Sequence, residues 1–291
     1  MVATSIINIR SICSQISVTS LYYIWSIDLG FILNIYSTNN WKGIVPDMTK
    51  VLIVTGGSRG IGHCVSVGAA KDGWDICINY KENKIRADET VELVKGLGKK
   101  SISVQADISK ENEIKHLFDE CEKQLGPISG FVNSAGIVEP YGNIAEVKND
   151  ELETLINLNV NGAILGSREA VKRMSTKYDG EGGSIVLLSS VSSRLGSPGA
   201  CVPYAASKGA VDALGWGLAQ EVAREGVRVN VVSPGLIDTE IQPEGRVEEQ
   251  GPSLPAGRAG RPEEVAAAIL WLLSDQASYV SGSNLMVSYA R

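Results

Sequence analysis

The sequence contains few of the residues that build metal sites, disulfide frameworks and nucleic-acid interfaces. It has two histidines, and its five cysteines are odd in number, widely spaced and free of a Cys-x-x-Cys pair. This pattern predicts no metal site and no disulfide framework, and it fits a reducing compartment. The net charge of -6 argues against nucleic-acid or anionic-membrane partners, which are bound through basic patches. We therefore expect a small molecule as the partner.

Long hydrophobic runs are also absent. The most apolar segment, residues 21–36, is interrupted by polar residues and is shorter than the roughly 20 residues of a membrane span. Residues 1–47 carry four charged side chains and no sustained period, so we expect an N-terminal extension outside the fold, with Met48 as the natural start. We expect a cytoplasmic protein, with organelle targeting or membrane attachment through residues 1–47 as the alternative.

From Met48 onward the chain alternates short apolar runs with helix-like segments. Val51 to Val54 is continuously apolar and is followed by glycines, as in a strand buried on both faces of a parallel sheet. The alternation predicts an α/β fold of the Rossmann type, a doubly wound parallel sheet of about seven strands in a single domain over residues 48–291. The other expected strands are 75–79, 101–106, 130–133, 184–189, 227–232 and 284–287, and the expected helices are 63–71, 83–95, 109–125, 148–175, 203–225 and 262–274.

The turn after the first expected strand is rich in glycine. Gly56, Gly60 and Gly62 are spaced as G-x-x-x-G-x-G, with Ser58, Arg59 and Ile61 between them. Glycines permit a tight turn and close approach of the backbone to a pyrophosphate, whose charge the following helix N-terminus would hold. The spacing differs from the G-x-G-x-x-G fingerprint, so a purely structural turn is the alternative.

The end of the second expected strand lacks the acid that would bind a ribose 2'-hydroxyl. The residues there are Asn79, Tyr80 and Lys81. Together with Arg59, Lys81 would present positive charge to a 2'-phosphate, which favours NADP(H) over NAD(H). Each cation taken singly could equally be a solvated surface charge.

Tyr204 and Lys208 lie four residues apart at the start of an expected helix and so share one face. A free tyrosine has a pKa of about 10, and a nearby ammonium would lower that pKa toward the range in which a phenol exchanges protons. As a bare pair the spacing is unspecific, because a packed ring beside a solvated amine is the more frequent arrangement.

Five motifs in chain order resemble the short-chain dehydrogenase/reductase family. They are the TGGSRGIG turn at 55–62, Asn133-Ser134-Ala135-Gly136, Ser190, Tyr204-x-x-x-Lys208 and Ser233-Pro234-Gly235. The resemblance covers residues 49–287 and is greatest to sugar-dehydrogenase-like and 3-oxoacyl carrier-protein reductase-like members.

The resemblance implies roles for individual residues. Tyr204 is the implied general acid in reduction and base in oxidation, Lys208 lowers its pKa and holds the nicotinamide ribose, and Ser190 bonds the substrate oxygen. Asn159 matches the asparagine that holds a water in a proton relay, with Asn161 as the alternative. Asp107 matches the adenine-contacting position, although a helix-capping role before Ser109 is equally open. The remaining implied cofactor contacts are Ile108, Asn133 with a mainly structural role, Ala135, Gly136, Pro234, Gly235, Ile237 and Thr239.

Several positions depart from the family pattern. Ser190 lies fourteen residues before Tyr204, one more than the commonest spacing, so Ser189 and Ser192 stay open as alternatives. The expected substrate lid, residues 240–261, is short and has little helical pattern. The chain ends in Val-Ser-Tyr-Ala-Arg where relatives usually carry a glycine pair. His63, next to the glycine turn, is interpreted as a helix-surface residue.

Together these features predict an NADP(H)-dependent oxidoreductase, a carbonyl reductase that transfers hydride between nicotinamide and a carbonyl or secondary alcohol of a small molecule. We expect a homo-oligomer, a tetramer or a dimer. The alternative is a non-catalytic NADP(H)-binding sensor or interaction protein on the same fold.

Overall fold

The computed structural model describes residues 50–290. The expected extension, residues 1–47, and Met48 lie outside the described residues. The described chain forms a sheet of seven parallel strands in the order β3-β2-β1-β4-β5-β6-β7, which confirms the predicted doubly wound fold. The strands are β1 (Val51–Thr55), β2 (Asp75–Tyr80), β3 (Ser101–Gln105), β4 (Ile128–Asn133), β5 (Gly183–Leu188), β6 (Val227–Pro234) and β7 (Asn284–Val287).

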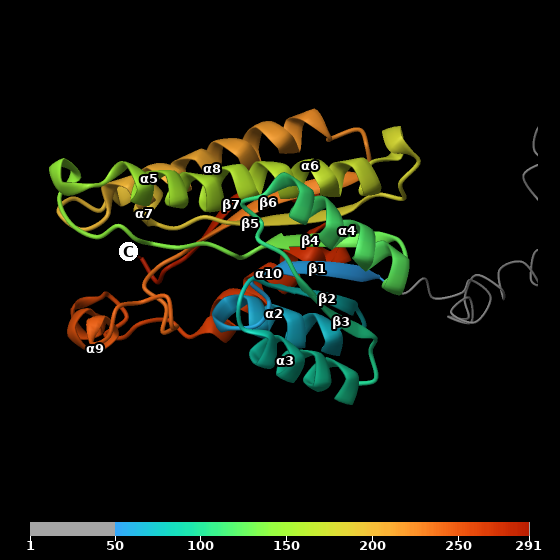
Figure 1. The fold of residues 1–291 in the computed structure, drawn as a ribbon, viewed down its shortest axis with the longest axis horizontal. Coiled ribbons are helices and arrows are strands. Elements are labelled where there is room, and N and C mark those ends of the chain that lie inside the picture. The colour runs from blue at the N-terminus through green and yellow to red at the C-terminus, as the bar shows by residue number, and fades with distance from the viewer. Residues whose placement is uncertain (1–49, 291) are drawn as a thin grey trace, which may run out of the picture. The chain divides into compact units, whose positions relative to one another are not determined.

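Helices cover both faces of the sheet (Figure 1). Val51 and Ile53 of β1 pack in the apolar core beneath α4, α6 and α8, whereas Leu52 and Val54 pack in the core beneath α2, α3 and α10. Alternate side chains of a strand point to opposite faces, so a strand covered on both sides is apolar throughout. The covering helices are α2 (Gly60–Lys71), α3 (Lys84–Gly96), α4 (Glu111–Leu125), α6 (Gly162–Met174), α8 (Val202–Glu221) and α10 (Pro262–Leu273).

Two segments differ from the expected helices. The single helix expected over 148–175 is α5 (Asn149–Ile156) and α6, joined by the π-helical turn η6 (Asn157–Asn161). The expected lid, in which the sequence has little helical pattern, contains α9 (Arg246–Gln250) and the 3-10 turn η8 (Gly251–Ser253). The other short pieces are α7 (Ser192–Leu195), η5 (Ile144–Glu146), η7 (Thr176–Tyr178) and η9 (Asp275–Ala277).

The carboxyl ends of the parallel strands meet at one edge of the sheet, where ligands of such folds bind. The two halves of the sheet meet between β1 and β4, because the chain crosses over after β3, and so the segments after β1 and β4 lie side by side. Within residues 50–290, no helix is long and apolar enough to cross a membrane.

Candidate functional site

The turn between β1 and α2 can be built only with glycine. Gly56 and Gly60 have φ angles of +62° and +52°. A Cβ placed on Gly62 would lie 2.3 Å from the carbonyl oxygen of Gly56. The first turn of α2 holds no acidic residue and no capping side chain, so its backbone N–H groups face the space beyond the strand end. This arrangement suits a phosphate group.

Thr55 fixes this turn against the end of β4. Its Oγ1 accepts hydrogen bonds from the backbone N–H groups of Ser134 (3.0 Å) and Ala135 (3.1 Å). The same hydroxyl donates to Asn133 Oδ1 at 3.2 Å, and Asn133 is 2 % exposed. A Cβ on Gly56 would lie 3.1 Å from the Ala135 Cα, so the two segments pass each other in close contact.

Asn79 and Tyr80, two of the expected cofactor contacts, are buried at the end of β2. The Asn79 side chain is buried, where its Nδ2 donates to the Ala106 carbonyl at 2.9 Å and its Oδ1 accepts from the Gly56 N–H at 3.4 Å. The Tyr80 ring is buried in the core beneath α2 and α3. Because helices cover β2 on both faces, the Asn79 side chain supports the glycine turn and the Tyr80 ring fills the core.

Lys81 and Asp107 form an ion pair at the ends of β2 and β3, with Nζ and Oδ2 3.1 Å apart. Asp107 Oδ1 accepts from the backbone N–H (3.0 Å) and the hydroxyl (2.7 Å) of Ser109. Burial acts to raise the pKa of Asp107, but the hydrogen bonds from Ser109 and the charge of Lys81 outweigh it and hold that pKa below its usual range. Helix α4 begins only at Glu111, so Asp107 caps the preceding turn.

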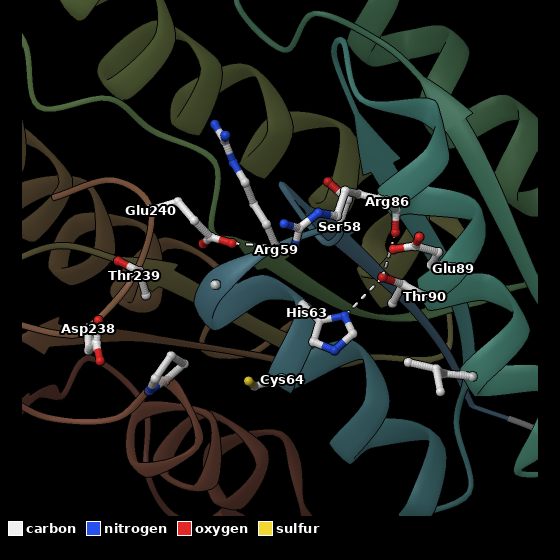
Figure 2. A pocket seen from close by; sticks show the side chains of 13 residues that line it. Ser58, Arg59, His63, Cys64, Arg86, Glu89, Thr90, Asp238, Thr239 and Glu240 are labelled. Carbon is white, nitrogen blue, oxygen red and sulfur yellow. Dashed lines mark hydrogen bonds and ion pairs between the residues drawn. The ribbon is translucent and has the colours of Figure 1, made fainter. Parts of the chain in front are cut away.

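A pocket of about 490 Å³ lies beside the glycine turn (Figure 2). We call it the arginine pocket, because Arg59 of the turn and Arg86 of α3 both line it. Arg86 Nη1 lies 3.5 Å from Glu240 Oε1, and among the described residues Arg59 forms no ion pair. Arg86 was not predicted as a site residue from the sequence. Its place in the first turn of α3 could have indicated an anion-binding role, since a cation at a helix N-terminus is unfavourable for the helix dipole.

His63 is half-buried between α2 and α3 and lines the same pocket. Its Nδ1 lies 2.9 Å from Thr90 Oγ1. Burial and the charge of Arg86 lower the pKa of His63 below its ordinary value. The residue therefore joins two helices, where the sequence indicated only a helix surface.

Ser190 and Tyr204 meet at the carboxyl end of β5. Ser190 is 7 % exposed, its side chain lies near the Tyr204 hydroxyl, and its Oγ accepts a hydrogen bond from the Ser192 N–H at 3.1 Å. The hydroxyl of the alternative, Ser189, donates to the Lys208 carbonyl at 3.0 Å, and this hydrogen bond holds α8 against the end of β5. Of these two serines, Ser190 is therefore the one that faces Tyr204.

Lys208 lies one helical turn after Tyr204 and is 6 % exposed. Its Nζ is 5.7 Å from the centroid of the Tyr204 ring and donates to the Leu188 carbonyl at 2.8 Å. Burial lowers the pKa of Lys208 to about 8, and the charge of Asp212 opposes that shift only in part.

The pKa of Tyr204 differs from the lowered value expected in the sequence analysis. Burial raises the pKa of Tyr204 to about 12, although the Ser190 side chain acts in the opposite direction. The partly buried side chain loses water that would stabilise a phenolate. The amine of Lys208 meanwhile faces the ring and bonds a carbonyl.

Asn159 holds the loop after β4 from within the π-helical turn η6. Its Nδ2 donates to the Ile137 carbonyl (2.9 Å) and to Ser207 Oγ (3.1 Å), and its Oδ1 accepts from the Ile137 N–H (3.0 Å). A Cβ on Gly136 would lie 3.1 Å from Asn159 Oδ1 and 3.5 Å from Lys208 Nζ. We call Ser190, Tyr204, Lys208 and Asn159 the tyrosine cluster.

Asn161, the alternative to Asn159, lies on the exposed side of the helix and donates to Asn157 Oδ1 at 2.9 Å. The remaining expected cofactor contacts are spread around the strand edge. Ile108 and Ile237 are buried in the two cores. Pro234 ends β6, and Gly235 donates its N–H to Val287. Thr239 lies across the glycine turn, with its Cγ2 3.3 Å from the place of a Cβ on Gly60.

Two further residues of the site were missed from the sequence. Tyr141, in the loop after β4, and Arg246, at the start of α9, lie together with the Arg246 Cζ 5.6 Å from the Tyr141 ring centroid. Both influence the pKa of Tyr204. Neither belongs to a motif, so no local signal in the sequence marks them.

Comparison with known proteins gives the chain its relatives. Residues 56–289 match a family model described as enoyl-(acyl carrier protein) reductase. An uncharacterised oxidoreductase of Escherichia coli, YgfF, is 46% identical over 80% of this chain and 96% of its own length. Glucose 1-dehydrogenase 2 of Bacillus subtilis is 36% identical over 83% and 94%. A solved short chain dehydrogenase from Burkholderia cenocepacia, in complex with NADP, has a TM-score of 0.77 at 30% identity, covering 83% and 97%.

Proposed function

Because this chain belongs to the short-chain dehydrogenase/reductase family, whose named relatives are oxidoreductases, we propose that it reduces a small-molecule carbonyl, or oxidises the matching secondary alcohol, with NADP(H). The observation that carries the proposal is the tyrosine cluster. Ser190 and Lys208 both lie against Tyr204, directly beyond the strands that also position the glycine turn. A bare nucleotide-binding protein has no need of that arrangement.

The residues around the glycine turn suit NADP(H), which supplies or accepts the hydride when bound. The free N–H groups at the start of α2 fit the pyrophosphate. Arg59 and Arg86, which line one pocket, fit the 2'-phosphate. Lys81 is a weaker candidate than the sequence indicated, because its charge is paired with Asp107. The Burkholderia relative in complex with NADP supports the same choice.

Tyr204 is the proposed proton donor. The raised pKa of Tyr204 keeps the phenol protonated at neutral pH, which is the form that can give a proton to the oxygen of a carbonyl being reduced. Ser190, whose side chain lies near the Tyr204 hydroxyl, would bind the same substrate oxygen. Lys208 adds positive character beside the ring, and Asn159 holds the loop and α8 at fixed distance.

We also propose a cytoplasmic homo-oligomer in which residues 1–47 are an extension outside the domain. Trp216 of α8 and Trp271 of α10 are 61% and 40% exposed, which is unusual for such large apolar rings and suits contact with further copies. Light scattering at several concentrations would test the assembly. Mass spectrometry of the native N-terminus would test Met48 as the start.

The deciding experiment follows NADPH and NADH absorbance with small ketones, diketones, sugars and acyl thioesters. The Tyr204→Phe variant should lose about 10²- to 10⁴-fold in kcat, the usual contribution of a general acid, while its Kd for NADPH stays within about twofold. Tyr178→Phe is the matched control, since that tyrosine is exposed on η7. NADPH binding without turnover would instead support the sensor, and no binding would overturn the role of the glycine turn.

A further inference from the structure

Arg246 has a buried donor without an acceptor. Its Nε is one of two buried side-chain polar atoms in residues 50–290 that lack a hydrogen-bond partner, the other being Ser167 Oγ. The guanidinium packs on the Tyr141 ring, with its Cζ 5.6 Å from the ring centroid. No described carboxylate lies within ion-pair distance of it. Buried donors in native proteins nearly always have partners, so this one requires an explanation.

Two other partly buried arginines among the described residues, Arg173 and Arg228, have acceptors for their guanidinium groups. Arg173 bonds the carboxylates of Asp119, Glu122 and Glu169. Arg228 donates to four backbone carbonyls at the end of α10 and beyond. Arg246 alone among these three keeps a buried nitrogen without an acceptor. Simple packing of the lid therefore does not account for its position.

Arg246 lies near the tyrosine cluster. The loop that carries Tyr141 pairs with the start of α8, where the Gly142 N–H donates to the Ala200 carbonyl at 2.8 Å. Tyr204 lies four residues further along the chain, at the start of α8. The positive charge of Arg246 reaches both tyrosines, since it acts to lower the pKa of each against the effect of burial. A molecule bonded to the Tyr204 hydroxyl would thus lie next to a cation.

We propose that Arg246 binds an anionic group, a carboxylate or a phosphate, carried by the substrate whose carbonyl oxygen Tyr204 protonates. The inference rests on the proposed reductase activity and narrows its substrate class to oxo acids or phosphorylated carbonyl compounds. A planar guanidinium makes paired, charge-assisted hydrogen bonds with either anion, and the unpartnered Nε would supply one of them. The Tyr141 ring orients the guanidinium of Arg246 by packing against it.

Matched substrate pairs test the proposal. 3-Oxobutanoate is compared with 2,4-pentanedione, in which a methyl ketone replaces the carboxylate, and dihydroxyacetone phosphate with dihydroxyacetone. Arg246→Gln should lower kcat/KM for the anionic member of the preferred pair by about 10- to 100-fold, mainly through KM, because one charge-assisted interaction is lost. The kcat/KM for the neutral member should change by less than about threefold. Arg246→Lys should recover part of the loss, since it keeps the charge but not the fork.

Glu249→Gln, on the exposed side of the same short helix, is the control and should leave both members unchanged. The carboxylate pair and the phosphate pair identify which anion is bound. Equal loss for neutral and anionic members in Arg246→Gln, or no preference for anions in the wild type while neutral ketones are reduced, would overturn the inference and leave the reductase activity intact. Failure of every carbonyl, neutral ones included, would overturn the proposed function itself.

Discussion

The tyrosine cluster and the arginine pocket are built beyond the same strand edge, but their surroundings differ. In the tyrosine cluster, Ser190, Lys208 and Asn159 are each less than a tenth exposed, and each side chain bonds to backbone. In the arginine pocket the ion pair of Arg86 with Glu240 is exposed by about half on both sides. One region is fixed by the fold, and the other has charges free to meet a ligand.

This difference in burial predicts whether a substitution changes mainly stability or mainly ligand binding. Buried polar groups lose their water and depend on their protein partners, so altering one disturbs folding and chemistry together. Exposed ion pairs contribute about 0–1 kcal/mol, so their charges can be exchanged at little loss of stability. Substitutions in the tyrosine cluster should therefore reduce stability, whereas substitutions in the arginine pocket should change the choice of cofactor.

The largest effect on stability is expected at Asn159. Asn159→Ala removes both partners of the Ile137 backbone and the bond to Ser207, so the free energy of unfolding should fall by about 3 kcal/mol. Asn161→Ala removes one exposed bond and should change it by less than about 0.5 kcal/mol. Urea unfolding of both variants measures the contrast. Equal effects at the two positions would mean that burial does not distinguish them.

A somewhat smaller effect is expected from pH at Lys208. Its folded pKa of about 8 lies below the value of 10.5 for an unperturbed lysine, so between these pH values the unfolded chain binds more protons than the folded one. The free energy of unfolding therefore rises with pH in this window, by about 2 kcal/mol between pH 7 and pH 10. Above pH 10 the raised pKa of Tyr204 contributes in the opposite direction.

Urea unfolding of the wild type and of Lys208→Met at pH 7, 8, 9 and 10 isolates this contribution. The wild type should gain about 2 kcal/mol relative to the variant across the series. Lys115→Met, at an exposed position of α4, should follow the wild type in parallel. Parallel curves for wild type and Lys208→Met would show that the buried amine is not desolvated in solution.

The sequence predicted the parts of the site that depend on local geometry. The glycine spacing predicts the turn after β1, in which Gly56 and Gly60 have positive φ angles. The four-residue spacing places Tyr204 and Lys208 on one face of α8. The alternation of apolar runs and helix-like segments predicted the doubly wound sheet, and the structure confirms it. Ser190 and Asn159 were named through the family resemblance, and the structure brings both to the tyrosine cluster.

The rest depends on packing between segments that are distant in the chain. Arg86 and Arg246 enter the site because α3 and α9 are placed there by tertiary structure, and neither lies in a motif. Tyr80 turns into the core because β2 is covered on both faces. The raised pKa of Tyr204 follows from crowding around one hydroxyl, which spacing along a helix does not specify.

The smallest effect, and the one that best separates the two regions, is expected at Arg86. Arg86→Gln should weaken NADPH binding about tenfold and leave NADH binding within about twofold, because one charge-assisted bond to the 2'-phosphate is lost. Glu240→Gln frees Arg86 from its ion pair and should tighten NADPH binding a fewfold. Lys81→Gln is the matched control with a smaller loss, since Lys81 is paired with Asp107.

Fluorescence titration of each variant gives the Kd values, and urea unfolding should show changes below about 1 kcal/mol for Arg86→Gln. A larger effect at Lys81 than at Arg86 would return the 2'-phosphate to the end of β2 and take it out of the arginine pocket.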